Sequence, residues 1–156
     1  MKKGEMLSKA IVIAVNGHNG QFDRGGNAYI LHPLKVMHYL KTDDEELQVI
    51  AVLHDVIEDS SGENRVTYED LRNAGISERV IVTVRGLTKV PGQTAEEYEQ
   101  AVLSNIDAML VKKEDLRHNS DIRRLKGVSE KDIKRMEKYN RFYLKIVAKL
   151  NELENE

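Results

Sequence analysis

The segment VIAVLHDVIED, residues 49–59, constrains the structure and chemistry of this chain more than any other. Five apolar residues are followed by a polar block of the pattern H-D-x-x-E-D, which contains His54, Asp55, Glu58 and Asp59. Burying charged side chains in an apolar segment is costly unless another group compensates them. A divalent metal ion would do so, and hydrolytic enzymes use metal ions to activate water. The segment therefore predicts a metal-dependent hydrolase.

Apolar spacing predicts helices along most of the chain. Near the start, apolar residues recur at the i, i+3, i+4, i+7 spacing of an amphipathic helix: Leu7, Ala10, Ile11 and Ala14. Pro33 suits the first position of a helix that starts beside His32. The last helix is expected from about Glu130 to about Leu153. One face of it is expected to pack on the core through Ile133, Met136, Phe142, Ile146 and Leu150.

Several short patterns mark helix starts and loops. Thr42-x-x-Glu45 predicts a capping box that opens the helix carrying the H-D pair, and Thr94-x-x-Glu97 predicts a second box. Thr67 and Ser129 are weaker caps, each with Asp three residues later. Residues 17–26, with four glycines, and residues 60–65 are expected to be loops. Residues 80–84 are β-branched enough for a strand, but their helical spacing favours a helix.

The composition limits the class of protein. At 156 residues, with 40% hydrophobic and 32% charged residues, the chain is predicted to form one domain over residues 1–156. The net charge of −2 and pI near 6.2 lack the basic excess that binding a nucleic-acid polymer usually requires. The chain has no cysteine, no apolar run of membrane-spanning length and no signal-peptide pattern. A cytoplasmic protein is therefore expected, and its oligomeric state is left open.

The polar block has the chemistry of a metal site. On one continuous helix, Glu58 would lie four residues after His54, and Asp59 four residues after Asp55. These spacings would place the four groups on adjoining parts of one surface. Neutral imidazole and carboxylate ligands suit Mn²⁺, Fe²⁺ or Zn²⁺.

Two ligands are too few, and two candidates elsewhere in the chain could complete the set. His32 lies at a predicted helix start and Asp115 in a polar helix, which together with the H-D pair would make two histidines and two aspartates. The alternative is that buried polar groups satisfy one another without any metal. His38 is expected to lie at the surface or in ordinary packing, and His18 to be a loop histidine or a group behind the ligands.

Four segments resemble, in order and spacing, the motifs of the RelA/SpoT hydrolase domain. They are QxxxGGxxYIxHPL at residues 21–34, LHDVIED at residues 53–59, GLTK at residues 86–89 and KxxDxxHN at residues 112–119. The resemblance covers about residues 5 to 126. It implies an all-α HD-domain helical bundle with one divalent metal ion, typically Mn²⁺. The residues that match the family's metal ligands are His32, His54, Asp55 and Asp115.

The resemblance also implies an activity. The family reaction removes pyrophosphate from the 3′ position of guanosine 3′,5′-bis(diphosphate), ppGpp, or of pppGpp. Glu58 and Asp59 match the acidic pair that activates water. The length of the chain is similar to that of a small stand-alone alarmone hydrolase. The implied partner is thus a nucleotide substrate, with no nucleic-acid polymer and no membrane.

The substrate contacts are less defined than the metal ligands. Arg24, Lys89 or Arg124 could neutralise phosphates, because cationic side chains pair with phosphate oxygens. The alternative for Arg124 is a solvated charge near a helix end. Asn119 shares a predicted helix face with Asp115 and could bind a substrate hydroxyl, or simply bond to its neighbours.

Two departures from the family pattern concern substrate recognition. The family often has consecutive basic residues where this chain has Asp23 and then Arg24, and a threonine where this chain has Ile122. Two alternatives to a ppGpp hydrolase therefore stand: an HD phosphohydrolase that acts on another 3′-phosphorylated nucleotide, and a metal- or nucleotide-binding module without turnover. The intact pair of Glu58 and Asp59 counts against the second.

Overall fold

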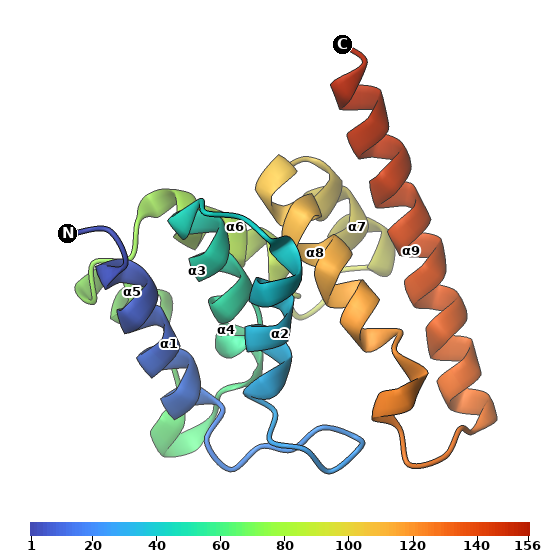
Figure 1. The fold of residues 1–156 in the computed structure, drawn as a ribbon, viewed down its shortest axis with the longest axis horizontal. Helices are drawn as coiled ribbons and strands as arrows, with labels where there is room; N and C mark the ends of the chain where they lie inside the picture. The colour runs from blue at the N-terminus through green and yellow to red at the C-terminus, as the bar shows by residue number, and fades with distance from the viewer.

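The computed structural model describes residues 1–156, which form a bundle of helices without a β-strand (Figure 1). The elements are α1 (Glu5–Gly17), α2 (Leu31–Leu40), α3 (Glu45–Leu53), α4 (Val56–Asp59), η1 (Gly62–Asn64), α5 (Tyr68–Asn73), α6 (Glu78–Leu87), α7 (Ala95–Leu103), α8 (Ile106–Asn119), η2 (Ile122–Arg124) and α9 (Glu130–Glu154). Residues 80–84 are helical, as their spacing predicts. The all-α prediction is confirmed. No helix combines the length and apolarity needed to cross a membrane.

Helix α3 lies at the centre of the bundle. It contacts α1, α2, α6 and α8, and residues 49–53 are all fully buried. This explains why the apolar run at the end of α3 has no polar face. Because α3 is enclosed on several sides, the side chains that follow Leu53 enter a site surrounded by other helices.

The long helix α9 packs on α8 and α7, and its C-terminal turns extend beyond the other helices (Figure 1). Phe142 and Ile146 are buried, as predicted. The prediction for Ile133 is wrong, since this side chain is 52% exposed. The first turns of α9 border a cleft instead of the core, and Met136 lines that cleft.

Local caps form at three of the four predicted positions. Thr67, Thr94 and Ser129 each make a full capping box with the acidic residue three positions later. The fourth prediction is wrong, because Asp44 is the N-cap of α3 and accepts hydrogen bonds from the backbone N–H groups of residues 46 and 47. A carboxylate directly before the helix is a strong acceptor for its free N–H groups. Thr42 instead accepts from the Asp44 N–H.

Two helix boundaries, the start of α2 and the end of α3, also differ from expectation. Pro33 is the third residue of α2, because the Leu31 N–H bonds to Ala28 and starts the helix earlier. Proline is tolerated there, since the first four N–H groups of a helix have no partner within it. Residues 54–59 do not continue one helix: α3 ends at Leu53, a turn at His54 and Asp55 follows, and α4 begins at Val56.

Candidate functional site

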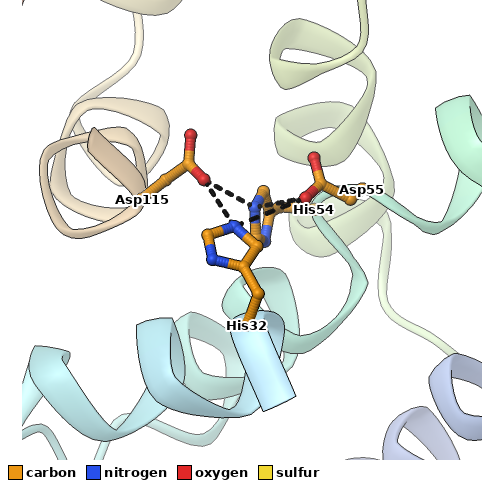
Figure 2. Close-up of side chains that lie close together, drawn as sticks. All are labelled: His32, His54, Asp55 and Asp115. Carbon is orange, nitrogen blue, oxygen red and sulfur yellow. Dashed lines mark hydrogen bonds and ion pairs between the residues drawn. The ribbon is translucent and has the colours of Figure 1, made fainter. Parts of the chain in front are cut away.

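Four side chains from three parts of the bundle converge on one point (Figure 2). His32 comes from α2, His54 and Asp55 from the turn after α3, and Asp115 from α8. One ligand atom of each lies within 4.8 Å of those of the other three. The structure therefore brings together the four residues that the sequence indicates as metal ligands.

The turn after α3 explains how two adjacent residues reach the same point. Neighbouring side chains on a regular helix diverge by about 100°. At the turn, the φ angle of Asp55 is −106°, and its Oδ2 lies 3.0 Å from the Nε2 atom of His54. The break in the helix thus gives the two side chains a common direction that a continuous helix would deny them.

The spacing of the donor atoms fits a metal ion. The Oδ1 atom of Asp115 lies 2.8 Å from His32 Nε2 and 3.2 Å from His54 Nε2. The Oδ2 atom of Asp55 lies 3.6 Å from His32 Nε2. Ligands about 2.1 Å from a first-row metal lie about 3.0–3.4 Å from one another at tetrahedral or octahedral angles. Two neutral imidazoles and two carboxylates can hold a divalent metal here.

The second nitrogen of each imidazole is already engaged. His54 donates its Nδ1–H to the carbonyl oxygen of Ala51 at 2.6 Å, which leaves Nε2 free to act as a ligand. The Nδ1 atom of His32 lies 2.7 Å from the Nδ1 atom of His118. Metal-binding histidines generally bind a hydrogen-bond acceptor through the nitrogen that faces away from the metal.

The charges in the cluster require a cation. Burial lowers the pKa of His54, but Asp55 and Asp115 outweigh it and raise that pKa well above its ordinary value. Burial raises the pKa of Asp115, but Lys112 and His54 hold it well below its usual range. Without metal, a proton on an imidazole therefore balances the carboxylates, and a metal ion at the same place would replace that proton.

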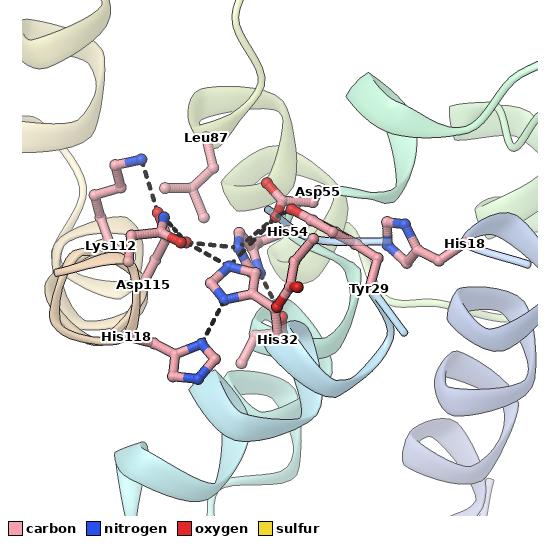
Figure 3. Close-up of polar contacts among 12 residues, drawn as sticks. His18, Tyr29, His32, His54, Asp55, Leu87, Lys112, Asp115 and His118 are labelled. Atoms are coloured by element: carbon pink, nitrogen blue, oxygen red, sulfur yellow. Dashed lines mark hydrogen bonds and ion pairs between the residues drawn. The ribbon is translucent and has the colours of Figure 1, made fainter. Parts of the chain in front are cut away.

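Three neighbours orient the two aspartates, and two of them, Lys112 and Tyr29, are labelled in Figure 3. Lys112 donates to the outer oxygen, Oδ2, of Asp115 at 2.8 Å, and Asn119 donates to its Oδ1 at 3.1 Å. Tyr29 donates to Asp55 Oδ2 at 2.5 Å. Sequence reasoning assigned no role to Lys112 or Tyr29. Both residues belong to the motif segments 21–34 and 112–119 that also contain candidate ligands, and this membership is the signal that would have found them.

A cleft of about 490 Å³ opens beside the cluster, a volume within the usual range for small-molecule sites. The predicted substrate-binding residues Arg24, Lys89, Asn119 and Arg124 all line it, as do both residues of the predicted catalytic pair. The first turns of α9 add Arg135, which the sequence did not indicate. The structure thus gathers cationic side chains from four separate segments around the proposed metal ligands.

The acidic pair lies in two different environments. Glu58 is exposed and its Oε1 accepts a hydrogen bond from the Lys89 backbone N–H at 2.9 Å. Asp59 is half-buried, and burial, followed by the charges of Asp55 and Glu58, raises its pKa to about 6. A carboxyl group with a pKa near neutrality is suited to exchange protons during catalysis.

Asp23 does not present a free negative charge to the cleft. Its Oδ2 pairs with Arg124 Nη2 at 3.3 Å, and Arg124 also donates to the carbonyl of His118 and to Oδ1 of Asn119. The close approach of the loop to η2 requires Gly25, because a Cβ there would collide with the Arg124 carbonyl oxygen. Arg124 is therefore held by protein groups from two sides.

The remaining predictions for individual residues have mixed outcomes. Ile122, which replaces the family's threonine, lies beyond the end of α8 at Asn119; it belongs to η2 and is 51% exposed. His38 is exposed, as expected. His18 is buried at the end of α1, where its Nδ1 lies 2.9 Å from Gln21 Oε1 and its Nε2 has no partner.

Comparison with known proteins gives sequence relatives named as (p)ppGpp hydrolases and as GTP pyrophosphokinases. The chain is 36% identical over 110 residues to a guanosine-3′,5′-bis(diphosphate) 3′-pyrophosphohydrolase of Vibrio cholerae, a match covering 69% of this chain and 15% of the relative. It is 32% identical over 108 residues to the bifunctional (p)ppGpp synthase/hydrolase SpoT of Escherichia coli, covering 67% of this chain and 14% of the relative. The chain therefore spans about one seventh of the length of these curated relatives. No protein-family model matches it.

A solved structure shows the same fold. It belongs to a metazoan ortholog of SpoT, described as hydrolysing ppGpp and acting in starvation responses, and superposes with a TM-score of 0.72. The superposition covers 96% of this chain and 87% of that one, at 21% sequence identity. The sequence relatives and the shared fold together identify the chain as a SpoT-like HD domain.

Proposed function

We propose that this chain is a metal-dependent phosphohydrolase that releases pyrophosphate from the 3′ position of ppGpp or pppGpp, with residues 1–156 acting as one catalytic domain. The observation that carries the proposal is the convergence of His32, His54, Asp55 and Asp115 at the edge of a cleft lined by cationic side chains. The relatives named as 3′-pyrophosphohydrolases support the same reaction.

The four converging side chains would hold the metal, for which we propose Mn²⁺. Such an ion supplies Lewis acidity at the phosphoryl group. Glu58 and Asp59 act on the attacking water: they orient it and one of them accepts its proton. The hydrogen bond from Lys89 keeps Glu58 turned toward the cleft, and the raised pKa of Asp59 suits it to the same role.

The phosphates would be held by the cationic lining of the cleft. Arg24 and Lys89 have no carboxylate partner in the structure, so they are available to pair with phosphate oxygens. Arg124 is already bound to Asp23, and we assign it a contact with one edge of the nucleotide. Asn119 lies beside Asp115 and would bind a substrate hydroxyl.

The experiment is hydrolysis of a nucleotide panel at saturating Mn²⁺, with products separated by anion-exchange chromatography. We expect ppGpp to yield GDP and pyrophosphate. The panel also contains other 3′-phosphorylated nucleotides at equal concentration. If no nucleotide of the panel is hydrolysed, the proposal is contradicted and the chain is a binding module.

One observation favours a second candidate, a phosphohydrolase of broader nucleotide preference. Asp23 neutralises Arg124 where the related domain often offers consecutive basic residues, and Ile122 offers no hydrogen bond. A site without polar partners for a substrate group discriminates weakly. We expect the double variant Asp23→Arg, Ile122→Thr to raise kcat/KM for ppGpp selectively. Strong and selective cleavage of ppGpp by the native chain would exclude this candidate.

A further inference from the structure

The two histidines of the proposed metal centre are oriented in different ways. The Nδ1–H of His54 is held by a main-chain carbonyl, that of Ala51, which no side-chain substitution removes. The Nδ1 atom of His32 faces a side chain instead, the imidazole of His118 (Figure 3). Of the two histidines, only His32 therefore depends on another side chain for its orientation.

The distance between the two imidazoles defines their hydrogen bond. The Nδ1 atoms of His32 and His118 lie 2.7 Å apart, so one of them carries the hydrogen and the other accepts it. A metal ligand needs a bare Nε2, and a neutral imidazole carries its single hydrogen on the other nitrogen. His32 must therefore be the donor whenever its Nε2 faces a metal ion, and His118 the acceptor.

The surroundings of His118 hold it in place for this task. Its ring lies nearly parallel to that of His32, with centroids 5.0 Å apart and planes 14° from parallel, and Tyr39 contacts its ring edge-on. It lies one helical turn after Asp115 in α8. Helix α8 thus provides one ligand directly and orients a second ligand, His32 of α2, through His118.

We propose that His118 is a positioning residue for metal binding, which accepts the Nδ1–H of His32 and thereby holds Nε2 of His32 toward the ion. The proposal rests on the metal centre of the proposed function but not on the identity of the nucleotide. Partners of this kind typically change metal affinity about 10- to 100-fold when they are removed.

The test is a calorimetric titration of the metal-free full chain with Mn²⁺. We expect His118→Leu to weaken Mn²⁺ binding about 10- to 100-fold. His118→Asn places an amide oxygen close to the position of the ring Nδ1, so it restores most of the affinity. His38→Leu removes an exposed histidine from the same helix as His32 and is the matched control, with unchanged affinity.

The outcomes separate this proposal from the others. Native affinity in a folded His118→Leu variant would overturn it, and so would an equal loss in the Leu and Asn variants, because that result indicates packing instead of a hydrogen bond. Failure of the native chain to bind Mn²⁺ would overturn the metal centre together with it. Weakened binding in His118→Leu with no hydrolysis of ppGpp by the native chain would support His118 and contradict the proposed substrate.

A spectroscopic measurement needs no variant. Long-range ¹⁵N–¹H spectra of the native chain loaded with diamagnetic Zn²⁺ report which nitrogen of each imidazole is protonated. We expect the hydrogen of His32 on Nδ1, within the bond to His118. A bare Nδ1 on metal-loaded His32 would overturn the proposal even if the substituted proteins failed to fold.

Discussion

Two clusters in this molecule gather carboxylates from distant segments but differ in what lies at their centre. On the surface, Arg79 of α6 bonds to Asp44 and Glu46 at the start of α3 and to Asp107 at the start of α8, at 2.8–2.9 Å. Inside, His32, His54, Asp55 and Asp115 face one another. The surface cluster contains its own cation, whereas the inner cluster surrounds a point where the chain places none.

The surface cluster joins three helices through ion pairs, whereas the inner cluster has the groups needed to bind a metal ion. Arg79 is 38% exposed and its guanidinium satisfies three carboxylates at two helix N-termini. In the inner cluster the one nearby cation, Lys112, engages only the outer oxygen of Asp115. The inner oxygens, Oδ1 of Asp115 and Oδ2 of Asp55, face the two imidazole nitrogens and also accept hydrogen bonds from the neutral side chains of Asn119 and Tyr29. A group of converging ligand atoms without a cation at its centre indicates a metal site. Substitutions in the two clusters should therefore have different effects on metal binding.

The largest effect is expected for Asp55→Ala. Removing one of four ligands should weaken Mn²⁺ binding by more than about 100-fold, since the loss of a residue that only orients a ligand already costs about 10- to 100-fold. Hydrolysis should fall to background. Calorimetry and a nucleotide assay measure the two effects. Asp107→Ala is the matched control, since it removes a carboxylate from the surface cluster and should change neither. Equal Mn²⁺ affinity in the Asp55→Ala variant and the native protein would contradict the interpretation of the inner cluster as a metal site.

Glu58→Gln should separate metal binding from turnover. The side chain keeps its size, so Mn²⁺ affinity is retained, but the proton acceptor is lost and kcat should fall about 10²- to 10⁴-fold. Steady-state kinetics at saturating Mn²⁺ measure the loss. Full activity here with a large loss in Asp59→Asn assigns the role to Asp59, and full activity in both variants excludes the acidic pair from water activation.

Arg79→Ala should break the surface cluster without touching the inner one. Three carboxylates lose their common partner, which should lower the free energy of unfolding by about 1–2 kcal/mol after allowance for solvent screening of this partly exposed group. Urea denaturation measures the change. Mn²⁺ affinity should stay at the native value, and a loss of affinity comparable to that of Asp55→Ala would show that the two clusters are not independent.

The smallest effect is expected for the stability of Asp59→Asn without metal. Folding raises the pKa of Asp59 to about 6, from an ordinary value of 3.8. The folded state therefore binds the proton more tightly, and native stability falls as the pH rises from about 4 to 6. Asparagine does not ionise, so the free energy of unfolding of the variant should exceed that of the native protein by about 1 kcal/mol at pH 7, after allowance for solvent screening. At pH 3.5 the two proteins should be equally stable. Chemical denaturation in chelator at both pH values measures this; a less stable variant at pH 7 would contradict it.

Features that depend on neighbours in the chain could be predicted from the sequence. The capping box of Thr94 and Glu97 spans three residues, and its two hydrogen bonds form wherever that segment turns into a helix. The helical period of residues 80–84 outweighed their β-branched composition, as the position of Val80 and Val84 in the core explains. The four candidate ligands could be named because each lies in a motif of characteristic spacing.

Features that depend on contacts between distant segments could not. Asp23 and Arg124 lie 101 residues apart, and only the packing of the glycine-rich loop against η2 brings them together. The break between α3 and α4 was also missed, because its advantage is the shared direction of His54 and Asp55 toward groups on other helices. Helical periodicity in the sequence contains no information about that direction.

From the sequence alone, the helical elements, most of their caps and the four side chains of the candidate metal centre could be predicted, because periodicity, capping and ligand type are properties of short segments. The tertiary structure decided which oxygen or nitrogen of each side chain faces the centre. Helices α2, α3 and α8 cross so that Lys112 and His118 take up the outward atoms of Asp115 and His32, while Tyr29 bonds to the inward oxygen of Asp55. The inward atoms then meet at distances that suit one metal ion, since packing between helices far apart in the chain sets those distances.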